Sequence, residues 1–131
     1  MTATACRSAE TVASPISPRR VGIAIVGGGF SGLGMGVRLR QAGIDDFEIL
    51  ERADRVGGTW RDNAYPGCAV DVQSHLYSFS FAPNPDWSCV YASREEIWGY
   101  IERCAERFGV DRHVRFGHEV QGAAWDDDSC G

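Results

Sequence analysis

The chain has 131 residues, of which 44% are hydrophobic and 24% are charged, and its formal net charge is −5. This composition is typical of one soluble globular domain and excludes a disordered chain or a bundle of membrane helices. The acidic balance offers no surface for nucleic acid or an anionic membrane, and the absence of lysine excludes a lysine Schiff base or a Walker phosphate site.

The first 20 residues are rich in Thr, Ala, Ser and Pro and show no apolar periodicity, which predicts a flexible N-terminal arm over residues 1–20. Arg19 and Arg20 precede an apolar run, as in a twin-arginine export signal. The uncharged stretch from Val21 to Val37 is short for a membrane span and is rich in glycine. We therefore expect neither export nor a membrane helix.

A strand, a helix and a second strand are predicted next. The apolar, β-branched run Val21–Val26 predicts a strand that is buried on both faces. Residues Ser31–Ala42 predict a helix that ends at Gly43, and Phe47–Leu50 predicts the second strand. This order is typical of a β-α-β unit, in which the two strands run parallel.

Two glycines, Gly34 and Gly36, lie inside the predicted helix. Each lowers helix propensity by about 1 kcal/mol relative to alanine. We expect a packing reason for them, namely a close approach of the helix to the sheet.

Residues 52–92 predict a long, mostly irregular segment, whose many aromatic residues argue against disorder. Ser93–Phe108 predicts the clearest helix, because Ser93 and Glu96 form a capping box and apolar residues recur at helical spacing. Gly109 ends it.

The C-terminal part predicts strand segments at Val114–Phe116 and Glu119–Trp125, followed by a turn at residues 126–129. The return strand that such a turn would feed is not in the sequence. We therefore expect the sheet to be incomplete.

The glycine pattern after the first strand carries the main chemical signal. Gly27, Gly29 and Gly32 supply a G-x-G-x-x-G pattern between a strand and a helix, and Glu51 ends the second strand. The glycines allow a tight turn, a close approach of the backbone to a pyrophosphate, and tight helix–strand packing. The pyrophosphate binds at the helix N-terminus, and the acidic residue accepts hydrogen bonds from the ribose hydroxyls of an adenosine.

This pattern predicts a dinucleotide with a free 2′-hydroxyl and leaves FAD and NAD open. The alternative is a glycine-rich turn in an unrelated α/β protein. Ser31 is not a hydrolase nucleophile. In a G-x-S-x-G turn one residue separates the serine from each glycine, whereas here Gly32 directly follows Ser31. The histidines, which are His75, His113 and His118, show no metal-ligand spacing, so we expect no metal site.

Two segments extend the pattern beyond the glycines. Residues 27–60 read GGGFSGLGMGVRLRQAGIDDFEILERADRVGGTW, and residues 63–81 read NAYPGCAVDVQSHLYSFSF. Together they resemble the N-terminal part of the class B flavoprotein monooxygenases, the flavin-containing and Baeyer–Villiger enzymes. The resemblance implies an α/β fold, with a Rossmann-like FAD-binding β-α-β unit in an incomplete doubly wound domain over residues 21–131.

The resemblance also implies the site residues. Those for the cofactor are Gly27, Gly29, Phe30, Ser31, Gly32, Glu51, Arg52, Gly58, Thr59, Trp60, Asp71, Tyr77 and Val120. Asp71 is the implied catalytic residue, near the flavin and the nicotinamide. Taken alone, Asp71 would more simply cap N–H groups in a loop, and Trp60 and Tyr77 would more simply be core aromatics.

Members of this family bind FAD and NADPH and insert one oxygen atom from O₂ into a ketone or a soft nucleophile. The second glycine pattern and the NADPH domain of the family are not in this sequence. We therefore expect an FAD-binding segment that is inactive and binds flavin weakly by itself, with a small-molecule substrate only in a completed protein. The alternatives are a nucleotide-binding module completed by a partner chain, or an inert remnant.

The cysteine pattern indicates the cellular compartment. Five are present, without Cys-x-x-Cys spacing or a zinc ladder, and an odd number without a secretory signal fits reduced thiols. We expect a cytoplasmic protein. A catalytic thiol stays open as an alternative, although no Cys/His signature accompanies any of the five.

Overall fold

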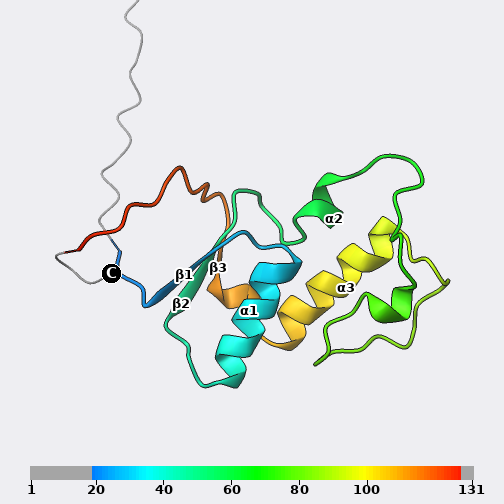
Figure 1. The fold of residues 1–131 in the computed structure, drawn as a ribbon, viewed down its shortest axis with the longest axis horizontal. Helices are drawn as coiled ribbons and strands as arrows, with labels where there is room; N and C mark the ends of the chain where they lie inside the picture. The colour runs from blue at the N-terminus through cyan, green and yellow to red at the C-terminus, as the bar shows by residue number, and fades with distance from the viewer. Residues whose placement is uncertain (1–18, 128–131) are drawn as a thin grey trace, which may run out of the picture.

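The computed structural model describes residues 19–127, which form one parallel sheet and the helices packed beside it (Figure 1). The strands are β1 (Ile23–Val26), β2 (Phe47–Leu50) and β3 (Val114–Arg115), in the order β1-β2-β3. Both pairs are parallel, so the predicted β-α-β unit is confirmed. The helices are α1 (Phe30–Gln41), α2 (Thr59–Asp62) and α3 (Arg94–Arg107), with short 3₁₀ turns η1 (Ser74–Leu76) and η2 (Asp111–His113).

The core lies between one face of the sheet and the helices. Phe47 and Ile49 alternate with less buried neighbours along β2, so one face of this strand carries the buried side chains. Leu33 and Val37 of α1 belong to the same buried cluster, as does Ile101 of α3. Apolar residues at helical spacing on α1 and α3 therefore bury the faces that the sequence predicted.

The helix glycines have the packing role that was expected, but in two different places. A Cβ on Gly36 would lie 2.7 Å from Val110 and 3.0 Å from Ile49, so this glycine lets α1 approach the sheet. A Cβ on Gly34 would lie 2.9 Å from Phe79, which belongs to the long irregular segment and not to the sheet. The expected sheet contact is therefore wrong for Gly34. Gly43 follows α1 with φ of 77° and confirms the predicted helix end.

The prediction that the first strand is buried on both faces is wrong. Ile23 is 36% exposed and Val26 is 69% exposed. The reason is the position of β1 at the edge of the sheet: α1 packs on one side of it, and the described residues add no strand or helix layer to the other side.

The predicted strand at Glu119–Trp125 is also wrong, whereas the neighbouring strand begins at Val114 as expected. A strand requires a ladder partner for its N–H and C=O groups. Within residues 19–127 no strand lies beside residues 119–125, and Trp125 is 74% exposed. Half of the turn predicted at residues 126–129, namely residues 128–129, lies outside the described residues, as do residues 1–18 of the predicted N-terminal arm.

Helix α3 begins as the capping box predicts. The Ser93 hydroxyl accepts a hydrogen bond from the Glu96 N–H, and Glu95 and Glu96 occupy the first turn. The Glu96 carboxylate also accepts hydrogen bonds from the N–H and hydroxyl of Ser88, at 3.0 and 2.7 Å. The two hydrogen bonds from Ser88 are the main reason why the pKa of Glu96 lies below its usual value.

The long segment between α2 and α3 is ordered by buried hydroxyls, although it contains only η1 as regular structure. The Ser74 hydroxyl donates toward the Cys89 and Val90 carbonyls and accepts from the Ala92 N–H. The Tyr100 hydroxyl of α3 accepts from the Phe79 N–H at 2.8 Å. Burial raises the pKa of Tyr100, so this hydroxyl keeps its proton.

Candidate functional site

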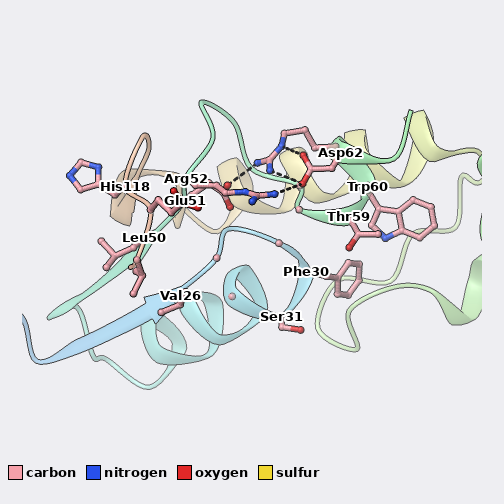
Figure 2. Close-up of a pocket in the computed structure, with 18 of the residues that line it drawn as sticks. Val26, Phe30, Ser31, Leu50, Glu51, Arg52, Thr59, Trp60, Asp62 and His118 are labelled. Carbon is pink, nitrogen blue, oxygen red and sulfur yellow. Dashed lines mark hydrogen bonds and ion pairs between the residues drawn. The ribbon is translucent and has the colours of Figure 1, made fainter. Parts of the chain in front are cut away.

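A cavity of about 590 Å³ lies at the carboxyl ends of β1 and β2, beside the N-terminus of α1 (Figure 2). This is the edge where ligands bind in open α/β sheets. Its lining comes from four segments and one further residue. The segments are Val26–Gly32 without Gly28, Leu50–Arg52, Gly57–Asp62 and His118–Val120, and the further residue is Tyr77.

The glycine turn has the backbone that the pattern requires. Gly27 has φ of 93°, a conformation that residues other than glycine rarely adopt. Its N–H donates to the Leu50 carbonyl at 2.9 Å. A Cβ on Gly32 would lie 1.9 Å from the Gly27 oxygen. Only glycine at this position lets the first turn of α1 pack against the loop.

The N-terminus of α1 lacks a side-chain cap at its N-cap position. Its N-cap residue is Gly29, which has no side chain to accept a hydrogen bond, and the first turn holds no acidic residue. The first N–H groups of a helix have no partner within the helix. Here they face the cavity as hydrogen-bond donors at the positive end of the helix dipole.

A second loop closes over the glycine turn. The Gly57 N–H donates to the Gly28 carbonyl at 2.9 Å, and a Cβ on Gly58 would lie 3.0 Å from the Gly29 Cα. Gly57 and Gly58 have φ of 132° and 53°. The two loops are therefore in contact. Gly58 leaves little room for a side chain, whereas a Cβ on Gly29 would make an ordinary 3.6 Å contact.

Glu51 lies between these loops and is only 4% exposed. Its carboxylate accepts hydrogen bonds from the Gly28 N–H at 2.7 Å, the Ala53 N–H at 2.9 Å and Arg61 Nη1 at 3.1 Å. Burial by itself would raise the pKa of Glu51, but the hydrogen bonds from Ala53, Gly28 and Arg61 outweigh it and hold this pKa below its usual value. Glu51 is therefore an ionised acceptor fixed against the glycine turn.

An ion-pair network extends from Glu51 along the cavity (Figure 2). Arg61 pairs with both oxygens of Asp62, at 2.8 and 3.2 Å, and Asp62 lies 3.6 Å from Arg52. Reasoning from the sequence missed Arg61 and Asp62. Their position directly after Trp60 was the available signal, but the pairing of Arg61 with Glu51 depends on how the loop folds back.

Aromatic side chains line the end of the cavity away from Glu51. Trp60 Nε1 donates to the Tyr77 hydroxyl at 3.0 Å, and their rings meet edge to face with centroids 5.4 Å apart. The Phe30 ring lies 5.3 Å from the Tyr77 ring. The cavity thus has a charged end at Glu51 and an aromatic end at Trp60, as Figure 2 shows.

The structure brings together every predicted cofactor residue except one. Asp71 is exposed and lies outside the cavity lining, on the segment between α2 and η1. Tyr65, which belongs to the same resembling segment as Tyr77, is 60% exposed and lies outside the lining as well. His118 and Glu119 line the cavity beside the predicted Val120 and were not predicted.

Residues 19–127 contain neither a metal-binding cluster nor a helix that could span a membrane. No group of three or more His, Cys, Asp or Glu side chains there is arranged to hold a metal ion. None of the helices in this part of the chain has the length and apolar character needed to cross a membrane.

Comparison with known proteins agrees with this geometry. Residues 25–93 match the model of the NAD(P)-binding Rossmann-like domain. The chain is 59% identical over 106 residues to a Baeyer–Villiger monooxygenase of Streptomyces coelicolor, which covers 81% of this chain and 20% of the relative. It is 50% identical over 118 residues to a Baeyer–Villiger monooxygenase of Pseudomonas aeruginosa, which covers 90% of this chain and 22% of the relative.

The chain is also similar to solved structures of monooxygenases. A steroid monooxygenase bound to NADP matches with a TM-score of 0.76 and 39% identity, over 81% of this chain and 21% of that one. OTEMO in complex with FAD and NADP matches with a TM-score of 0.76 and 31% identity, over 82% of this chain and 21% of that one. The chain therefore spans about a fifth of the length of the proteins it matches.

Proposed function

We propose, on the premise that this chain belongs to the NAD(P)-binding Rossmann-like domain family, that its cavity binds FAD. The observation that carries the proposal is the N-terminus of α1, which has no side-chain cap at Gly29 and lies at the edge of a cavity where two glycine loops are in contact. A cavity of about 590 Å³ is within the usual size of ligand sites, about 300–1,000 Å³.

The glycine turn fits a pyrophosphate. The N–H groups at the start of α1 supply donors, and no acidic side chain in that turn repels the phosphate charge. Gly29 and Gly58 leave room for the backbone to approach the ligand closely. We assign Gly27, Gly29, Ser31, Gly32 and Gly58 to this part of the cofactor.

The carboxyl end of β2 fits the adenosine ribose. Glu51 is ionised and fixed, and it lines the cavity next to the glycine turn. A carboxylate there accepts hydrogen bonds from ribose hydroxyls and repels a 2′-phosphate. Arg52 and Val120 line the same end, and we place them beside the adenosine.

The aromatic end fits the flavin. FAD, when bound, supplies the redox chemistry by which an oxygen atom of O₂ is transferred. Phe30, Thr59, Trp60 and Tyr77 orient the ring and exclude water from it, and the Trp60–Tyr77 hydrogen bond fixes that wall. Asp71 is kept as a proposed acid near the flavin on the strength of the family resemblance.

For the whole protein we propose an NADPH-dependent monooxygenase that inserts one oxygen atom into a ketone or a soft nucleophile. The relatives named Baeyer–Villiger monooxygenase and the related structures bound to NADP support this proposal. We also propose that it works in the cytoplasm, which agrees with the free thiols of Cys68, Cys89 and Cys104.

Titration of the purified chain with FAD, followed by flavin fluorescence, tests the proposal. Riboflavin is the control, because it carries the ring without the pyrophosphate and adenosine. We expect FAD to bind more tightly than riboflavin, ADP to displace it, and Glu51→Ala to weaken it. Equal binding of FAD and riboflavin, or no binding of FAD, would contradict the assignment of the glycine turn and Glu51.

A second candidate is a nucleotide-binding module that a partner chain completes. The exposed apolar side chains of β1 favour it, since Val26 is 69% exposed and Ile23 is 36% exposed. This candidate predicts a stable complex with a chain that carries an NADPH-binding domain, measured by co-purification. Absence of such a complex would leave only the first candidate.

A further inference from the structure

Arg61 occupies an unusual place for a charged side chain. It is only 11% exposed, and it faces Glu51, of which the side chain is 5% exposed. Burying two charges is unfavourable unless they are paired and their remaining groups are hydrogen-bonded. Arg61 meets this condition, because its guanidinium also donates to the Arg55 carbonyl and to Asp62.

The contacts of Arg61 fix its direction. Nε and Nη2 bind the two oxygens of Asp62 in a forked arrangement, and Nη1 is then directed at Glu51 Oε1. Asp62 in turn lies 3.6 Å from Arg52. The charges therefore alternate along the cavity, and Glu51 is the only one of them bonded to the glycine turn.

We propose that Arg61 is a positioning residue for the nucleotide, which acts by holding the Glu51 carboxylate against the Gly28 N–H so that the adenosine ribose meets a fixed acceptor. The inference rests on the proposed FAD site and adds to it. Arg61 lies on α2, whereas Glu51 directly follows β2 and is bonded to Gly28, so this ion pair connects the second glycine loop to the first. Arg61 thereby links α2 to the acceptor that is bonded to the first loop.

The first test needs no flavin. Glutamate-labelled chain is titrated by NMR to follow the ionisation of Glu51, together with the amide signals of Gly28 and Ala53. We expect Arg61→Gln to raise the pKa of Glu51, because it removes a hydrogen bond and an opposite charge, and to shift the Gly28 amide. Arg103→Gln is the charge-matched control, since Arg103 is exposed on α3. An unchanged Glu51 titration in Arg61→Gln would overturn the inference.

The second test is a double-mutant cycle on FAD affinity. We expect Arg61→Gln to weaken FAD binding about tenfold or more. In a Glu51→Gln background the same substitution should have little further effect, because Arg61 acts through Glu51. Additive losses would overturn the inference, since they would mean that Arg61 contacts the nucleotide itself or only supports the fold.

Two outcomes separate this inference from the proposed function. If the unmodified chain binds no FAD, the proposed function fails, and the Glu51 titration still decides whether Arg61 positions that carboxylate. If circular dichroism shows that the Arg61→Gln chain does not fold, the Arg61→Lys variant is used instead. Lysine keeps the charge and loses the forked contact. Weakened FAD binding with Glu51 still ionised would then support positioning, and unchanged binding would refute it.

Discussion

The N-termini of α1 and α3 differ in whether a side chain caps their first N–H groups. Both helices begin with N–H groups that lack partners within the helix. At α3, Ser93 caps the helix and Glu95 and Glu96 complement its dipole. At α1, Gly29 occupies the cap position, no acid lies in the first turn, and the end opens into the cavity.

This difference separates a structural helix start from a binding one. At α3, the Ser93 hydroxyl accepts from the Glu96 N–H and the Cys68 carbonyl accepts from the Arg94 N–H, so this end contributes stability. The chain leaves α1 to be completed by a negatively charged group, which we propose is the FAD pyrophosphate. The predictions below test whether stability and binding separate in this way.

The largest effect is expected from Gly32→Ala. The new Cβ would lie 1.9 Å from the Gly27 oxygen, which is backbone and cannot rotate away. We expect a loss of about 3 kcal/mol in stability and loss of FAD binding, measured by thermal unfolding and flavin fluorescence. Gly99→Ala is the control within α3, because its Cβ would meet only the flexible end of Arg103 at 3.2 Å. Equal tolerance of both variants would refute the tight turn.

Gly29→Asp should weaken FAD binding with little loss of stability. Gly29 has an extended backbone, with φ of −84° and ψ of −167°, and its Cβ would make an ordinary 3.6 Å contact with Gly58. The new carboxylate would cap α1 and repel the pyrophosphate, so FAD affinity should fall about 10- to 100-fold. The matched variant Ser93→Asp at α3 should leave affinity unchanged. A stable Gly29→Asp chain with full FAD affinity would contradict the phosphate site.

Ser93→Ala should show the reverse pattern. Removal of the Ser93 hydroxyl takes away the cap on the Glu96 N–H. We expect a loss of about 1 kcal/mol in the free energy of unfolding, measured in denaturant, with FAD affinity per folded chain unchanged. A fall in affinity at constant folded fraction would show that α3 also shapes the site.

The smallest effect concerns pH. The pKa of Glu51 is lowered in the folded chain, so its contribution to stability is complete above the unfolded value of 4.5 and is lost as pH falls through the folded value. We expect Glu51→Gln to flatten the decline of stability below about pH 4.5. Glu96→Gln, at the start of α3, is the comparison, because its pKa is lowered too. Unchanged acid sensitivity in Glu51→Gln would contradict the buried, hydrogen-bonded carboxylate.

Local signals explain what could be predicted of the fold. Gly27 at positive φ, the Ser93 cap and the helix end at Gly43 each depend on a few neighbouring residues. Such features are determined within one turn of chain, so reasoning from the sequence found them. The exposed face of β1 and the irregular segment 119–125 were predicted wrongly, because both depend on whether another strand lies alongside.

The sequence by itself determined the β-α-β unit, the glycine turn and the acid that ends β2, because each follows from backbone sterics and hydrophobic spacing. Only the tertiary structure decided that Arg61 holds Glu51 and that Asp71 lies outside the cavity lining. The physical reason is that a contact between residues on different elements depends on how the intervening loop folds back. For Arg61 that loop is ordered by contacts with α3, since Trp98 donates to the Val56 carbonyl and Arg94 donates to the Trp60 carbonyl.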